Sequence, residues 1–362
     1  MNTFSSVDTV GKPKYLRFIK MWLLAGVVMI FFQVVIGGIT RLTGSGLSIT
    51  KWEIVTGTFP PMSEAGWEEA FDLYKETPQY EKINQGMTMS EFKFIYFWEY
   101  FHRLWARLMG IVFIVPFVFF LTRKAFGQLL LRRLIVVFLL AALVASFGWI
   151  MVASGLTERP WVNAYKLTMH LSLAFICYSY LLWTFFKVYR PNGAAMASTK
   201  LNQAILLIVA LLSLQIILGG TVSGMRAALL YPTWPAMHGQ FVPEILLQAA
   251  AWNAKNFVNY DSNAFMAAFV QFFHRNVGYL VAALIVWFVV RLIKTNPPQS
   301  LRKASFAMVV ALGVQVLLGI LTLLNSIGTV PVGLGVFHQA GALMLLSLTL
   351  WMKYLIQKQQ TS

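Results

Sequence analysis

The stretches FWEYFHRLWARLMGIVFIVPFVFFL at 97–121 and FVQFFHRNVGYLVAALIVWFVVRLI at 269–293 have the same design. Each begins with aromatic residues that end in a His-Arg pair. Each continues as an apolar run long enough to cross a bilayer, which takes about 20 helical residues. The third residue differs, because Glu99 in the first stretch is Gln271 in the second. The chain therefore carries two related membrane segments, and this repeat is the starting point for its fold.

Composition indicates an integral membrane protein. Of the 362 residues, 58% are hydrophobic and 12% are charged, whereas about 25% of the residues in soluble domains are charged. The first apolar run is long and lacks a small-residue cleavage site, so we interpret it as a retained helix of a bacterial inner (cytoplasmic) membrane. Apolar runs of membrane-spanning length predict eight transmembrane helices, near 19–40, 97–121, 130–153, 166–188, 202–224, 266–292, 304–326 and 333–354.

The positive charge of the chain sets its predicted orientation. The formal net charge is +16, but the basic residues lie in short connections and form no basic face, so we expect no nucleic-acid partner. Lys and Arg gather before the first predicted helix, after the second, fourth and sixth, and at the end of the chain. By the positive-inside rule, both termini are expected to be cytoplasmic.

The two halves of the chain match at several further places. QVVIGG at 33–38 corresponds to QIILGG at 215–220, TFPPM at 58–62 to TWPAM at 233–237, His170 to His338, and, more weakly, Gly148 to Gly319. Each half has four predicted helices, so both halves enter the membrane from the same side. We therefore predict an all-α membrane fold of two tandem four-helix bundles, related by a pseudo-two-fold axis along the membrane normal.

This organisation predicts a boundary between the halves and a long outer loop in each. The predicted segments are a cytoplasmic tail 1–16, an N-terminal half 17–190 with an outer loop 41–96, a cytoplasmic linker 191–201, a C-terminal half 202–355 with an outer loop 225–265, and a cytoplasmic tail 356–362. The loops can hold amphipathic helices, for example SEAGWEEAFDLYKE at 63–76, which we expect to cap the bundle on its outer face.

Four of the five histidines, His102, His170, His274 and His338, lie in predicted membrane helices. Ionisable residues in membrane spans are rare and usually functional. The predicted orientation places all four at one depth, in the outer part of their helices. Two imidazoles from facing helices are what six-coordinate haem iron requires, so two pairs predict two haem-sized sites.

Other roles for these residues remain open. A membrane histidine can simply form an interhelical hydrogen bond. Zinc is less favoured, because neither pair has the partners that a four-ligand site needs. The only cysteine, Cys177, lies in the fourth predicted helix, so no intramolecular disulfide is possible. Arg103 and Arg275 follow their histidines and could contact haem propionates, or could equally extend to the membrane surface.

Glu99 precedes His102 by three residues, so both side chains point to one face of the helix. The carboxylate could act on whatever the histidine binds, or could form a structural hydrogen bond with Arg103 or an adjacent helix. Burying it is costly unless it is paired or protonated. Gln271 keeps the shape of Glu99 but cannot ionise, so we expect the halves to share a scaffold and to differ in chemistry.

Taken together, these motifs resemble haem A synthase, an integral membrane family of cytochrome oxidase assembly. The likeness rests on EYFHR at 99–103, GGITRLTGSGLSITKWEIVTGTFPP at 37–61 and the FHR and FHQ sites around His274 and His338, and it covers nearly the whole chain. Some members carry a cysteine pair in the first outer loop. This chain has none there, so it resembles the cysteine-free type of proteobacteria and mitochondria.

The resemblance implies that a ring methyl group of haem O is oxidised to a formyl group through successive hydroxylations, giving haem A for cytochrome oxidase. It implies that His274 and His338 are axial ligands of a haem b cofactor, that His102 and His170 flank the iron of the substrate haem, and that Glu99 is catalytic. Glu99 would relay protons or stabilise a cationic intermediate. The expected partners are haem O, membrane lipid, an external electron donor of a ferredoxin-like kind, haem O synthase and oxidase assembly factors.

Two other classes of protein explain part of the pattern. A di-haem membrane cytochrome b that only transfers electrons needs the same four histidines, but gives Glu99 no reason to differ from Gln271. A transporter with parallel repeats would use the charged residue for coupling and would need broken helices at the midplane. The Gly-Gly pairs at 37–38 and 219–220 lie instead near the outer ends of their helices.

Overall fold

The computed structural model describes residues 11–51, 59–155, 160–191, 193 and 195–357. Most of both predicted tails, at 1–10 and 358–362, and part of the quoted first-loop motif, at 52–58, lie outside the described residues. Within them, eight helices are long and apolar enough to cross a membrane, which confirms the predicted number. They are α2 (Pro13–Leu42), α5 (Met89–Thr122), α6 (Gln128–Ala153), α7 (Ala164–Tyr189), α8 (Thr199–Gly224), α11 (Phe265–Ile293), α12 (Gln299–Leu324) and α13 (Val332–Leu355).

Local sequence signals set several helix ends. Thr88 and Glu91 form a capping box at the start of α5, in which each side chain accepts a hydrogen bond from the other residue's backbone N–H. The side chains of Asn163 and Ser198 accept hydrogen bonds from the first N–H groups of α7 and α8. Because of this capping box, helix α5 begins at Met89, well before the apolar run that starts at residue 97. The apolar run marks only the part of the helix that crosses the membrane.

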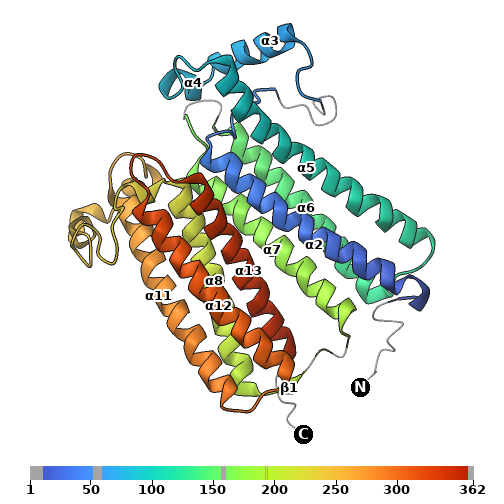
Figure 1. Ribbon diagram of the computed structural model, residues 1–362. Coiled ribbons are helices and arrows are strands. Elements are labelled where there is room, and N and C mark those ends of the chain that lie inside the picture. Colours follow the sequence, from blue (N-terminus) through green and yellow to red (C-terminus); the bar gives the residue numbers. More distant parts are fainter. Residues whose placement is uncertain (1–10, 52–58, 156–159, 192, 194, 358–362) are drawn as a thin grey trace.

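The helices pack in the same pattern in both halves (Figure 1). In the N-terminal half, α2 contacts α5 and α7, and α6 contacts α7; in the C-terminal half, α8 contacts α11 and α13, and α12 contacts α13. Between the halves, α7 packs on α8, and α13 packs on α2. This reciprocal packing supports the predicted pseudo-two-fold relation, although the axis itself remains a prediction.

Polar contacts join the two halves. Arg41 of α2 donates to the carbonyl oxygens of Ser223 and Gly224, at 2.9 and 3.3 Å, at the C-terminal end of α8, where helix carbonyls have no partner in the next turn. Gln339 of α13 donates to the carbonyl oxygen of Val34 on α2 at 2.7 Å. The first helix of the N-terminal half is therefore held by hydrogen bonds to two helices of the other half.

The connections gather at two opposite ends of the bundle (Figure 1). We call the end with the two long loops the loop end, and the other the terminal end, because the described chain begins and ends there. At the loop end, α3 (Glu64–Lys75) and α4 (Pro78–Lys82) cover the N-terminal half, and α3 confirms the predicted amphipathic helix. The second loop contains only short helices: η2 (Ala227–Leu229), α9 (Glu244–Leu247), η3 (Ala249–Ala251) and α10 (Ala254–Val258).

One feature of the terminal end was not predicted. Strand β1 (Met196–Ala197) pairs in parallel with β2 (Ile356–Gln357). The segment between the halves is thereby fixed to the segment that follows the last helix.

Candidate functional site

A cavity of about 1140 Å³ lies inside the bundle and reaches into both halves. All four membrane histidines and Glu99 line it, together with Arg103, Arg275 and Gln271. Its volume exceeds the range of about 300–1000 Å³ that is usual for a single small-molecule pocket. The predicted site residues are thus brought together, but the two expected sites share one cavity.

Each histidine ring lies against a glycine of a neighbouring helix. The pairs are Gly37–His102, Gly148–His170, Gly219–His274 and Gly319–His338, in which a Cβ added to the glycine would lie 3.1, 2.9, 3.0 and 2.8 Å from the ring Cε1. Any larger residue would push on the imidazole. Real Cβ atoms essentially never make contacts as short as those at Gly148 and Gly319, and the contacts at Gly37 and Gly219 are tighter than nine in ten real ones. This close approach explains why the repeat retains glycine at these positions.

A glutamine on the first helix of each half contacts the first histidine. Gln33 Nε2 lies 3.2 Å from the carbonyl oxygen of His102 and 3.2 Å from its Nε2. Gln215 Nε2 lies 2.9 Å from the carbonyl oxygen of His274 and 3.4 Å from its Nε2. Sequence reasoning did not assign a role to these glutamines, although both matched hexapeptides, QVVIGG and QIILGG, begin with them.

The second histidine of each half has different surroundings. His170 Nδ1 lies 3.0 Å from the carbonyl oxygen of Val144. His338 Nδ1 lies 3.2 Å from the carbonyl oxygen of Gln315 and 3.2 Å from its side-chain Nε2. The Gln315 amide occupies space that Gly341 leaves free, because a side chain there would collide with Gln315 Oε1. The imidazole in the C-terminal half therefore has an extra amide contact.

The carboxylate of Glu99 is buried, with 3% of the residue exposed, and accepts hydrogen bonds from four donors. Its Oε2 accepts from the Ser48 N–H at 2.7 Å, the Ser48 hydroxyl at 2.8 Å and the Ile49 N–H at 2.9 Å. Its Oε1 forms an ion pair with Arg103. Three donors thus surround Oε2 and one cation pairs with Oε1, so both oxygens of the carboxylate are held in place. The pair with Arg103 matches the structural alternative considered above, whereas the bonds to residues 48–49 were not foreseen.

Gln271 contacts the corresponding loop of the other half with the opposite polarity. Its Nε2 donates to the carbonyl oxygen of Tyr231 at 3.0 Å, and Arg275 donates to the same oxygen at 2.9 Å. The backbone thus presents N–H groups to Glu99 and a C=O group to Gln271. The polarity of the facing backbone therefore explains why one half has an acid and the other an amide at this position, which the sequence alone did not show.

A buried hydrogen-bond chain holds the loop that binds Glu99. Tyr74 of α3 donates to Gln79 Oε1 at 3.1 Å and accepts from Asn84 at 2.7 Å, and Gln79 Nε2 donates to the carbonyl oxygen of Gly44 at 2.9 Å. Burial raises the pKa of Tyr74 to about 12. The α3–α4 cap consequently supports the loop at 43–49 from the loop end.

Both arginines that follow the histidines contact the protein. Arg103 pairs with Glu99, and Arg275 donates to the carbonyl oxygens of Tyr231, Pro235 and Ala236. Both arginines also line the cavity. Contact between either arginine and a haem propionate stays a prediction. Arg107, which also lines the cavity, was not singled out from the sequence; the repeat has a tyrosine, Tyr279, in its place.

The histidines of the C-terminal half fit a six-coordinate haem. The ring centroids of His274 and His338 lie 6.4 Å apart, with the ring planes at 85°, and metal–imidazole bonds of about 2 Å leave room for one ion between them. His274 Nδ1 is buried and has no hydrogen-bond partner among the described residues. Within the same residues, no three His, Cys, Asp or Glu side chains gather into a metal site. The His274–His338 pair can thus supply the two axial ligands of a haem.

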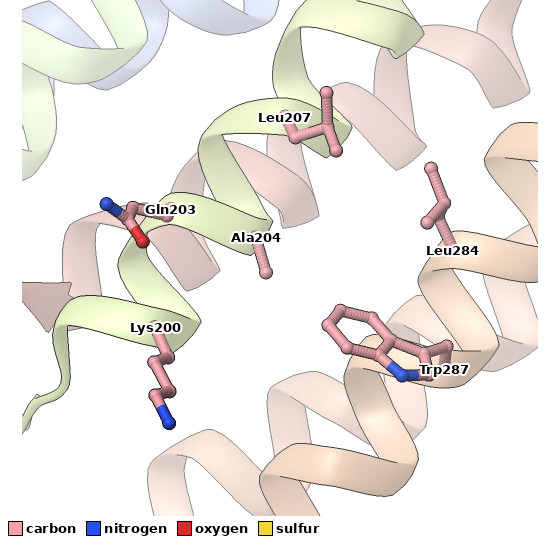
Figure 2. A pocket seen from close by; sticks show the side chains of 6 residues that line it. All are labelled: Lys200, Gln203, Ala204, Leu207, Leu284 and Trp287. Atoms are coloured by element: carbon pink, nitrogen blue, oxygen red, sulfur yellow. The ribbon is translucent and has the colours of Figure 1, made fainter.

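A second hollow lies on the outside of the C-terminal half, between α8 and α11. Figure 2 shows Ala204 and Leu207 of α8 across from Leu284 and Trp287 of α11, with Lys200 toward one end. Its lining is mostly apolar and includes none of the predicted site residues. We therefore assign it no role in the chemistry.

Comparison with known proteins places the chain among cytochrome oxidase assembly proteins. It matches the family described as Cytochrome oxidase assembly protein over residues 20–350. It is 40% identical to the haem A synthase of Nitrosospira multiformis, over 94% of both chains. It is 43% identical to that of Flavobacterium psychrophilum, over 91% of this chain and 95% of the relative. It is 41% identical to the haem A synthase of Parvibaculum lavamentivorans, over 97% of this chain and 98% of the relative.

Proposed function

Since the chain belongs to the cytochrome oxidase assembly protein family, we propose that it is a haem A synthase, an oxidoreductase that converts haem O to haem A by oxidising a ring methyl group to a formyl group. One observation carries the proposal: two histidine pairs line one cavity, and an ionisable carboxylate lies beside only one of them. Such a cavity can hold a reacting haem and an electron-transferring haem close together.

The two halves have different roles in this proposal. His274 and His338 would hold a haem b, and a bound haem with two imidazole ligands supplies one-electron transfer. His102 and His170 would flank the iron of the substrate, haem O. The glycines behind all four rings, and the glutamines beside His102, His274 and His338, fix where the imidazoles lie, so that both haems would be held at defined positions.

Glu99 acts in this proposal as a fixed negative charge beside the substrate. Three donors hold its Oε2 and Arg103 pairs with its Oε1, so the carboxylate is fixed in position as a charged acceptor. That arrangement favours stabilisation of positive charge that develops as the methyl group is oxidised, rather than proton relay. Arg103 keeps Oε1 in place, and the loop at 48–49 keeps Oε2 in place.

The proposed location is a bacterial inner membrane, with the terminal end in the cytoplasm and the loop end outside. This follows from the basic residues in the terminal-end connections. Reporter fusions after residues 125, 195 and 297 should be cytoplasmic, and fusions within 60–90 or 235–260 should be external. A cytoplasmic reporter in either long loop would reverse the orientation. An external electron donor, haem O synthase and oxidase assembly factors are the proposed partners.

Pigment analysis tests the function. The chain is expressed in cells that make haem O but no haem A, and haems are extracted from the membranes and from the purified protein. Haem A in the membranes, and haem B with haem O or haem A in the purified protein, are expected. Haem B alone, with no haem A formed, would overturn the synthase and leave the electron-transferring cytochrome b.

A further inference from the structure

The cavity extends farther toward the terminal end in the N-terminal half than in the C-terminal half. On α2 its lining reaches Trp22, whereas on α8 it reaches only Leu212, which corresponds to Ile30 of α2. The helix between Trp22 and Ile30 rises about 12 Å. The walls of this extension are apolar and include Gly26, Phe113, Val137, Phe138 and Leu181.

In the C-terminal half, larger side chains occupy the corresponding space. The repeat replaces Gly26 of α2 with Ile208 of α8, and Ala141 of α6 with Leu312 of α12. Ile208 and Leu312 are both buried and belong to the main hydrophobic core. The extension is therefore specific to the N-terminal half, and the difference lies in side-chain size at matching positions.

The extension opens to the side of the bundle between α5 and α6. These two helices hardly pack against each other, whereas α11 and α12 do. Several residues of α5 and α6 both line the cavity and are exposed on the molecular surface: Ile114, Phe138, Ala141, Ala142 and Ala145. In a helix bundle that spans the membrane, an opening between two such helices faces lipid.

We propose that this extension binds the isoprenoid tail of haem O and lets the tail pass between α5 and α6 toward the lipid. The inference rests on the proposed function, because haem O carries this tail where haem B carries a short vinyl group. A long apolar chain needs a long apolar channel, which the N-terminal half has. A resident haem b has no tail, and Ile208 and Leu312 fill the matching space in its half.

Closing the channel with the residues of the other half tests this inference. The double variant Ala141→Leu with Ala145→Val introduces the side chains found at the matching positions, Leu312 and Val316. Full-length wild type and variant, each with its resident haem, are titrated separately with haem O and haem B, and binding is followed in the Soret band. In wild type, haem O should bind at least ~10-fold more tightly, since even one methylene in an apolar pocket changes affinity or specificity by about 10-fold or more.

The variant should lose at least ~10-fold in affinity for haem O, the same order as a methylene-sized change in an apolar pocket, and keep its affinity for haem B. As a matched control, Ser146→Val adds volume at an exposed neighbouring position outside the cavity lining and should bind both haems as wild type does.

Unchanged haem O affinity in the double variant, or an equal loss for both haems, would overturn the inference. Equal affinity of the wild-type protein for haem O and haem B would also overturn the inference, and would indicate that the channel is occupied only by lipid. The titration needs no turnover, so a chain that discriminates the haems but forms no haem A would count against the proposed reaction only.

Discussion

In the N-terminal half, the Nδ1 of His170 lies near the carbonyl oxygen of Val144, whereas in the C-terminal half the Nδ1 of His338 lies near both the carbonyl oxygen and the side-chain amide of Gln315. The cavity beside His170 extends toward the lipid, and that beside His338 is closed by Leu312. The glycine behind each ring is the same in both halves. The comparison indicates that the repeated parts set the positions of the histidines, and that the changed parts suit one half to exchange its ligand and the other to retain it.

The largest expected effect comes from removing histidines, because it separates the two halves completely. His274→Ala or His338→Ala should abolish the low-spin haem b spectrum of the purified protein, since each removes an axial ligand. His102→Ala or His170→Ala should keep that spectrum and abolish haem A formation. His238→Asn serves as a control. His238 is an exposed loop residue with a positive φ, which asparagine tolerates, so this variant should change neither the haem b spectrum nor haem A formation. An unchanged haem b spectrum in both C-terminal variants would show that the halves have been assigned the wrong way round.

Exchange of the residue that differs between the His-Arg stretches should have the next largest effect. Glu99→Gln removes the charge while keeping an oxygen for Ser48 and Ile49, so haem b should be retained while haem A formation falls by at least ~100-fold. Haem O, or a partly oxidised intermediate, should accumulate in extracted pigments. Near-normal haem A at a normal protein level would return Glu99 to a purely structural role.

The structure requires a control for this variant, because Glu99→Gln also breaks the ion pair with Arg103. Ser48→Ala removes one hydrogen bond to the carboxylate and leaves its charge. It should reduce haem A formation by only about 10-fold, the effect of losing one hydrogen bond to a charged group of about 1.5 kcal/mol. If Ser48→Ala were as damaging as Glu99→Gln, the loop contact, and not the charge, would explain the loss.

Gln315 sharpens the comparison of the second histidines. Gln315→Val copies Val144 and removes the amide beside His338, so haem b affinity should fall by about 10-fold, the low end for loss of a residue that orients a metal ligand. Haem transfer to apomyoglobin measures the change. The reverse exchange needs two substitutions, Val144→Gln with Leu173→Gly, because Leu173 stands where Gly341 makes room. If Gln315→Val released haem at the wild-type rate, Gln315 would have no role in retaining haem b.

The smallest expected effect lies in the α3–α4 cap of the N-terminal half. Tyr74→Phe removes two buried hydrogen bonds and should destabilise the α3–α4 cap by about 1–2 kcal/mol, seen as faster proteolysis of the first loop with haem b unchanged. The wild-type cap should also loosen at high pH. The pKa of Tyr74 is about 12 in the folded protein against 10.0 normally, so its stabilisation is complete below pH 10 and is lost as the pH rises toward 12. Equal proteolysis of Tyr74→Phe and wild type at neutral pH would contradict this role for the hydroxyl.

The sequence by itself determined the eight helices, the repeat and the four histidines. These are local properties, because an apolar run of membrane length and an imidazole within it are visible without knowing what packs beside them. The capping box at Thr88 and Glu91 shows the limit of this approach, since it extends α5 beyond the apolar run.

Only the tertiary structure decided how these parts form a site. That all four histidines share one cavity depends on helices from both halves lying side by side. The partners of Glu99 come from a loop far from it in the chain, so no periodicity could have indicated that Ser48 and Ile49 donate to it. The depth of the N-terminal cavity depends on Gly26 and Ala141, two small residues on different helices. Each is unremarkable in the sequence, and the space they leave exists only because their helices border the same cavity.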